Sequence, residues 1–175
     1  MFEILSFVLS AVSMLLFMIS NFLKGKKMGA ILVLNVVGNL MMAAGYVCVS
    51  NASGAAISAI AAVVGIINYF YAAKQKKIPV WLLIVYSVVF ICANLATFSN
   101  WKDIISLIAA LTAVFVISSP NGKQYRIWAI TNQSLWCLFD VLCGNWGPLA
   151  SHLALACTTF LGILKNDIRK APVHE

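Results

Sequence analysis

Two ionisable residues, Asp140 and His152, interrupt long apolar runs in the last quarter of the chain. They lie at similar distances from a short turn at residues 143–148, so two antiparallel helices would place them at similar depth. A carboxylate surrounded by hydrocarbon is costly and normally faces a partner or a cavity. Burial disfavours the charged form of each group, whereas mutual pairing favours it. This pattern predicts either a proton-coupled gate or a static hydrogen bond between helices.

A second group combines amides with aromatic rings at helical spacing, as a binding site for a small polar ring would require. Its members are Asn35, Asn39, Tyr46, Trp128, Asn132 and Trp136. Asn39 and Asn132 fall near the middle of their apolar runs, where two amides flanked by indole rings could bind a substrate by hydrogen bonds and stacking. The alternative is that the asparagines only hydrogen-bond one helix to another.

The sequence offers no motif for catalysis, metal or cofactor binding. The five cysteines have no metal-ligand spacing, and no phosphate-binding loop, dinucleotide glycine pattern or nucleophile elbow is present. Ser151, His152 and Asp140 match a catalytic triad in composition only, and a triad is defined by geometry. We therefore expect no enzyme, no metal and no cofactor. A disulfide between Cys48 and Cys143, which approach the same end of their helices, is left open.

Composition indicates a membrane protein. Hydrophobic residues make up 62% of the chain, charged residues 10%, and the mean hydropathy is +0.95. In soluble domains, charged residues account for about a quarter of the chain. The apolar runs are about 20 residues long, enough for a helix to cross a hydrocarbon core of about 30 Å. Runs of this length and continuity favour helices over a barrel.

We predict seven membrane-spanning helices separated by short polar or basic turns. Their expected bounds are residues 4–23, 28–49, 54–73, 79–96, 104–117, 125–143 and 148–164. Pro79 is expected as a first helical residue, and residues 118–123 are expected to interrupt the helix between the fifth and sixth spans.

The basic residues predict the orientation of these spans. If the connections alternate between the two sides, 11 of the 12 lysines and arginines fall on one side and only Lys102 on the other (12 − 1 = 11). The positive-inside rule then places the N-terminus outside and the C-terminus in the cytoplasm. The formal charge of +7 follows from this topology and from contact with anionic lipid. It therefore does not argue for a nucleic-acid partner.

The chain also shows a weak internal repeat. With a shift of about 93 positions, which is the spacing from Asn39 to Asn132, Gly54 aligns with Gly147. Parallel repeats occur in transporters that bind their ligand near the bilayer midplane. The expected divisions are a first three-helix repeat at 1–77, a linker helix at 78–98, a second repeat at 99–170 and a short cytoplasmic tail at 171–175.

This 3+1+3 plan, with an asparagine in the second and sixth spans, resembles the MtN3-like superfamily of SWEET sugar carriers and PnuC-type vitamin transporters. More closely, the stretch from Gly38-Asn39-Leu40 through residues 51–55, followed later by residues 127–162, resembles the Imp/YgjV-type family of bacterial inner-membrane proteins. The resemblance implies a seven-helix inner-membrane fold. The first, second, fifth and sixth spans contain no proline, so the helix kinks by which SWEET carriers are thought to rock do not carry over.

Together these features predict an all-α, multi-pass protein of the bacterial inner membrane with a SWEET-like 3+1+3 arrangement. We expect a carrier or facilitator for a small polar metabolite, similar to a vitamin, a nucleoside or a sugar, that works by alternating access. Its expected partners are the lipid bilayer and an unidentified small-molecule substrate, and a homo-oligomer is left open. The rival interpretation is a structural or regulatory membrane protein that does not transport and whose polar residues only lock helices together.

Overall fold

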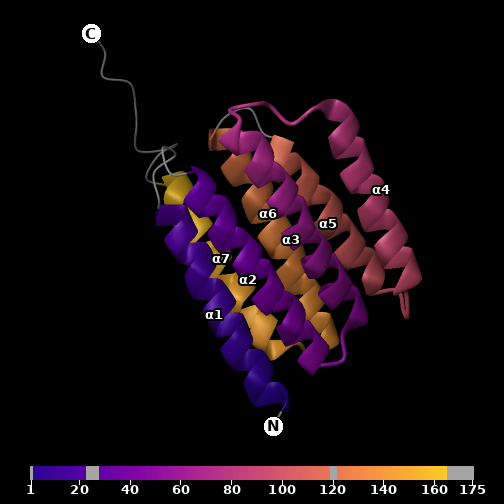
Figure 1. The fold of residues 1–175 in the computed structure, drawn as a ribbon. Helices are drawn as coiled ribbons and strands as arrows, with labels where there is room; N and C mark the ends of the chain where they lie inside the picture. The colour runs from indigo at the N-terminus through magenta and orange to yellow at the C-terminus, as the bar shows by residue number, and fades with distance from the viewer. Residues whose placement is uncertain (1, 23–27, 119–121, 165–175) are drawn as a thin grey trace.

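The computed structural model describes residues 2–22, 28–118 and 122–164, and this part of the chain is all α-helical with short turns (Figure 1). The prediction of an all-α fold with seven helices is therefore confirmed. The expected basic turn at residues 24–27 and the expected tail at residues 171–175 lie outside the described residues. The helices are α1 Phe2–Phe22, α2 Met28–Cys48, α3 Ala52–Ala73, α4 Val80–Ala96, α5 Asp103–Ser118, α6 Gly122–Cys143 and α7 Trp146–Ile163.

The helix bounds differ from the predicted spans by a few residues. Pro79 is not the first helical residue, because its backbone is extended (φ −74°, ψ 149°) and it precedes α4 as the N-cap. Its carbonyl accepts the amide of Leu82 at 3.0 Å, as an N-cap carbonyl does. Helix α6 begins at Gly122, earlier than expected. A glycine is tolerated there because the first turn of a helix lacks internal partners for its amides.

Six of the helices form a closed ring in which each packs against two neighbours, and α4 lies outside the ring. Helices α1, α2 and α3 lie side by side in chain order, and so do α5, α6 and α7. Helix α1 also packs against α7, α3 packs against α5, and α4 covers the α3–α5 edge (Figure 1). The N-terminus and the α2–α3, α4–α5 and α6–α7 turns therefore lie at one end of the bundle.

Four helical stretches of the described chain are long and apolar enough to cross a membrane: Phe2–Ser20, Gly29–Cys48, Ala52–Ala73 and Trp146–Ile163. Two shorter apolar helices accompany them, Val80–Ala96 and Asp103–Val116. Helix α6 has a polar first turn, GKQYR, which lowers its hydropathy. These lengths support a protein that crosses the membrane several times, and a crossing by all seven helices stays a prediction.

The core lies between one row of helices, α1 to α3, and the other, α5 to α7. The outer faces of the helices are apolar as well. Tyr46, Ile57, Tyr86 and Phe139 are almost fully buried in one hydrophobic cluster. Large apolar side chains are nevertheless exposed on every helix, among them Phe7, Val33, Phe70, Trp81, Phe115, Leu138 and Phe160. A soluble protein rarely exposes contiguous apolar surface on this scale, whereas a membrane protein presents such a surface to lipid.

Two buried asparagines attach α4 to the rest of the bundle. Asn94 Nδ2 donates toward Ser106 Oγ at 2.8 Å, the carbonyl of Asp103 at 3.0 Å and Ser53 Oγ at 3.1 Å. Asn68 Oδ1 accepts the Tyr86 hydroxyl at 2.9 Å. Polar bonds of this kind hold helices together where hydrocarbon surrounds them. Asn94 thereby ties α4 to α3 and α5.

Candidate functional site

A fully buried carboxylate forms the centre of the candidate site. Asp140 on α6 has no exposed surface, and its Oδ2 lies 2.7 Å from His152 Nδ1 on α7. Its Oδ1 accepts the Tyr46 hydroxyl from α2 at 2.8 Å and Asn145 Nδ2 at 3.3 Å. The expected proximity of Asp140 and His152 is confirmed. We call these four residues the Asp140 cluster.

Aromatic rings pack against the Asp140–His152 pair. The His152 ring stacks on Trp136 with centroids 5.6 Å apart and planes at 19°. Trp136 also contacts Tyr46 at 6.1 Å and Phe139 at 5.7 Å between centroids. In so apolar a setting a hydrogen bond is stronger, and an unpaired polar group is more costly. A proton lies on the Asp140–His152 contact in either form: on Nδ1 if the carboxylate is ionised, or on Oδ2 if it is neutral.

The α6–α7 turn places Asn145 in this cluster. Gly144 adopts a left-handed conformation (φ 73°), which glycine allows without steric cost. The Asn145 amide then donates back to the Asp140 carbonyl at 2.9 Å, a common way of ending a helix. This turn returns the Asn145 side chain toward the Asp140 carboxylate. Asn145 shows no side-chain cap bond to α7.

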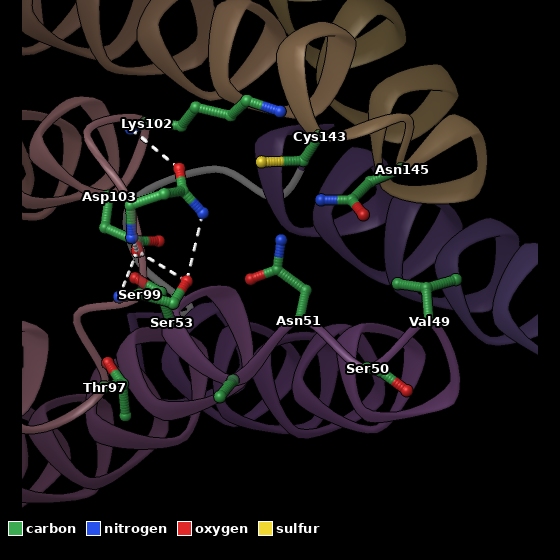
Figure 2. A pocket seen from close by; sticks show the side chains of 12 residues that line it. Val49, Ser50, Asn51, Ser53, Thr97, Ser99, Lys102, Asp103, Cys143 and Asn145 are labelled. Carbon is green, nitrogen blue, oxygen red and sulfur yellow. Dashed lines mark hydrogen bonds between the residues drawn. The ribbon is translucent and has the colours of Figure 1, made fainter.

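A polar cavity of about 300 Å³ lies at the same end of the bundle, among the three turns that meet there. Figure 2 shows the side chains of Asn51, Cys143 and Asn145 converging on it, with Lys102 along one side. We call it the end cavity. Its lining consists of Val49, Ser50, Asn51, Ala52, Ser53, Thr97, Ser99, Asn100, Lys102, Asp103, Cys143 and Asn145.

Two adjacent residues bring opposite charges to the end cavity. Lys102 is partly exposed, and its Nζ donates to the carbonyl of Leu142 at 2.7 Å. The Asp103 carboxylate is nearly buried, and its Oδ2 accepts the amides of Ser99 at 2.8 Å and Asn100 at 3.0 Å. These bonds fix the α4–α5 turn against the end of α6.

The end cavity and the Asp140 cluster meet at Asn145. This side chain lines the cavity and also donates to Asp140. A solute in the cavity would therefore be separated from the buried carboxylate by a single amide. The arrangement can bind a polar molecule at one end of the bundle and transmit its presence to a titratable pair inside.

The structure gives the two mid-span asparagines other partners. Asn132 is buried, and its Nδ2 donates to the carbonyl of Ala109 at 2.6 Å and to Thr112 Oγ1 at 3.0 Å, both on α5. Asn39 Nδ2 donates within its own helix to the carbonyl of Asn35 at 2.8 Å. Neither asparagine lines the end cavity.

The predicted aromatic residues divide between the interior and the surface. Tyr46 and Trp136 belong to the Asp140 cluster and its wall. Trp128 is 36% exposed and stacks on Phe115, which is 51% exposed, with centroids 4.8 Å apart. Asn35 Oδ1 accepts a hydrogen bond from Ser20 Oγ at 3.3 Å and so connects α1 with α2. The structure thus brings Tyr46 and Trp136 to Asp140 and His152, while Trp128 faces outward.

Sequence reasoning missed four residues: Asn51, Asn94, Lys102 and Asn145. Asn51 and Asn145 each follow the last turn of a helix, so their equivalent places in the two halves were an available signal. Lys102 is the one basic residue on its side in the predicted topology, which was also a signal. The disulfide left open between Cys48 and Cys143 is not formed, and all five cysteines are free. Among the described residues, no group of three His, Cys, Asp or Glu side chains could hold a metal ion.

Comparison with known families agrees with this membrane architecture. The model of the Imp-YgjV family, described as bacterial inner membrane protein, matches residues 4–170. The chain belongs to the Imp-YgjV family. No curated protein and no solved structure matches it. Membership identifies an inner-membrane protein and confirms the more specific of the two resemblances. None of these comparisons connects this Imp-YgjV protein to the SWEET or PnuC-type carriers.

Proposed function

We propose that this Imp-YgjV protein is a carrier or facilitator that moves a small polar metabolite across the inner membrane. The observation that carries the proposal is a buried carboxylate–histidine pair separated by one asparagine from a polar cavity. Ionisable residues inside membrane segments are costly and commonly mark substrate or proton pathways. A structural contact alone does not require an adjoining cavity.

The geometry of two turns supports a parallel repeat in this carrier. The Asn51 amide donates to the Tyr46 carbonyl and the Asn145 amide to the Asp140 carbonyl, both at 2.9 Å. The residue before each asparagine is left-handed, with φ of 55° and 73°. Tyr46 and Asp140 therefore occupy equivalent places in the two halves, and their side chains bond to each other across the interface.

Helix packing supports the same 3+1+3 arrangement. The first helix of each proposed repeat packs against the third helix of the other, α1 on α7 and α5 on α3. Reciprocal contacts of this kind fit two three-helix units related by an axis along the membrane normal. The proposed units are residues 1–77 and 99–170, with 78–98 as the linker. We place the N-terminus and the end cavity outside, as the distribution of basic residues predicts.

In the proposed cycle the Asp140 cluster acts as a gate below the end cavity. The Tyr46–Asp140 bond joins the two halves, so inward movement of a substrate requires it to break. A change in the protonation of Asp140 or His152 alters the strength of that bond. The gate therefore couples opening to a proton, and substrate contact by Asn39 and Asn132 would follow once the interior opens.

Reconstitution in lipid vesicles tests this proposal. The purified protein is assayed for uptake of vitamins, nucleosides, sugars and amino acids at several pH values, beside Asp140→Asn. We expect saturable uptake of one class, with a pH dependence that Asp140→Asn flattens. Full pH dependence in Asp140→Asn would contradict the coupling, and absence of uptake across the panel would contradict the carrier.

The alternative, a membrane protein that does not transport, is favoured by one observation. Asn39 and Asn132 already donate to backbone carbonyls, as asparagines that only join or brace helices do. Labelling distinguishes the two. Single cysteines at Val36 and Gln133, beside these asparagines, are placed on a cysteine-free background and exposed to a charged thiol reagent. Reaction shows that water reaches mid-depth, as a carrier requires, whereas protection of both favours the structural alternative.

A further inference from the structure

We infer that the end cavity binds a small zwitterion such as an α-amino acid, with its carboxylate on Lys102 and its ammonium group on Asp103. This inference deepens the proposed function by naming a substrate class and rests on it. The cavity was not among the sites that the sequence predicted. It follows from charges that the fold brings to one polar hollow.

Lys102 provides the anion-binding group. An ammonium has three N–H donors, and one of them is held by the Leu142 carbonyl at 2.7 Å. The carbonyl fixes Nζ at the cavity and leaves two donors for a ligand. Charge-assisted bonds from such a group to a carboxylate are about twice as strong as neutral ones. On the N-terminal side of the predicted topology, no other lysine or arginine competes for the ligand.

Asp103 provides the cation-binding group. Its Oδ2 accepts three hydrogen bonds, from the amides of Ser99 and Asn100 and from Ser99 Oγ. Its Oδ1 has no hydrogen-bond partner within the part of the chain that the structure describes. Since a carboxylate has about four acceptor sites on its two oxygens, the side chain that caps the start of α5 retains acceptor capacity for an ammonium group.

The pairing of these charges selects a zwitterion. A solute with only a negative charge would lie beside the Asp103 carboxylate, and one with only a positive charge beside Lys102, so each would meet repulsion. A neutral solute would leave both charges without a ligand partner. A volume of about 300 Å³ is at the low end of small-molecule pockets, which suits an amino acid better than a nucleotide.

Ligand binding is measured by thermal unfolding of the purified full chain in detergent against the proteinogenic amino acids. We expect at least one amino acid to raise the unfolding midpoint, because a ligand that binds only the folded state stabilises it. The two matched analogues of each hit, the deaminated acid and the carboxamide, should bind at least about tenfold more weakly, since each lacks one charge-assisted bond.

Substitutions then assign the carboxylate contact. Lys102→Met should weaken binding by about tenfold or more, whereas Lys102→Arg, which keeps the charge, should retain most of it. Lys76→Met is the matched control, because Lys76 is exposed in the α3–α4 connection at the other end of the bundle. If Lys102→Met fails to fold, the comparison of zwitterion with analogues in the unaltered protein still decides.

The outcomes separate this inference from the carrier proposal. Equal binding of a hit and its analogues, or the absence of any amino-acid hit, would overturn the zwitterion site even if vesicles take up another solute. Amino-acid binding that depends on Lys102 would support the site. If that amino acid is bound but not taken up by vesicles, the carrier fails while the site stands.

Discussion

Asp140 makes three hydrogen bonds inside an apolar bundle, and this count determines what its replacement costs. Asp140→Leu would leave the Tyr46 hydroxyl, His152 Nδ1 and Asn145 Nδ2 without their shared acceptor. Removing one partner of a buried pair typically costs about 3–5 kcal/mol of unfolding free energy. We expect Asp140→Leu to lose about that much, measured by unfolding in detergent micelles.

Asp140→Asn should be much milder, because the amide oxygen still accepts from Tyr46 and the amide group can donate to His152 in its other tautomer. Glu3→Gln is the control for loss of an acid, since Glu3 is exposed near the start of α1. Equal destabilisation by Asp140→Leu and Asp140→Asn would show that charge, and not hydrogen bonding, holds the cluster together.

The residue scale also shows what spacing alone can predict. Asp140 and His152 could be paired from the sequence because both are rare in apolar runs and lie symmetrically about one short turn. The bond from Tyr46 to Asp140 could not, because it depends on how α2 crosses α6. For Asn39 and Asn132, the helical spacing predicted which helix face each side chain lies on, but not which group accepts its hydrogen bond. Asn39 bonds one turn back in its own helix, and Asn132 bonds a carbonyl on α5.

At the scale of elements, several glycines mark close approaches of helices, and two of them bear on the candidate site and on the α1–α7 contact. A Cβ on Gly147 of α7 would lie 3.0 Å from the Phe7 Cα of α1, which is backbone and cannot rotate away. We expect Gly147→Ala to destabilise the protein by about 1–3 kcal/mol, the usual cost of overpacking. Gly162→Ala on the same helix is the control, since its Cβ would meet Arg126 Cδ at an ordinary 3.5 Å. Equal thermal midpoints for the two variants would contradict the α1–α7 contact.

A second glycine, Gly54 of α3, lies against Tyr46 of the Asp140 cluster. A Cβ there would lie 2.7 Å from Tyr46 Cδ1, so Gly54→Ala must displace the ring whose hydroxyl bonds Asp140. A double-mutant cycle with Tyr46→Phe tests this. Gly54→Ala should cost about 1 kcal/mol less in the Tyr46→Phe background, where the hydrogen bond is already absent. Strict additivity would mean that the ring moves without breaking the bond.

Element boundaries were predictable where composition changes sharply, and less so where a turn residue joins a helix. The α2–α3 and α6–α7 turns were found from small polar residues, glycine and proline. Pro79 was assigned one position too far into its helix because fixed φ suits both the first helical residue and the residue before it. The hydrogen bonds that attach α4 to α3 and α5 were not predictable, because a single asparagine such as Asn94 gives no periodic signal.

At the scale of the whole molecule, the proposed topology makes a direct prediction. Cysteines introduced one at a time at Asn100 and Lys76 lie at opposite ends of the bundle, on a cysteine-free background. In intact cells, a membrane-impermeant thiol reagent should label Asn100→Cys and spare Lys76→Cys, because the basic loops face the cytoplasm. The reverse pattern would invert the orientation, and labelling of both would contradict an odd number of crossings between them.

The packing of α1 against α7 has a consequence for biosynthesis. The Ser151 hydroxyl donates to the Ser10 carbonyl at 2.6 Å, and the Ser6 and Ser10 hydroxyls are buried with no hydrogen-bond partner among the described residues. Because translation proceeds from the N-terminus, α1 emerges before α7, and the part of its serine face that contacts α7 stays uncovered until α7 has entered the bilayer. A ribosome stalled after α6 would leave both this face and Asp140 without their α7 partners.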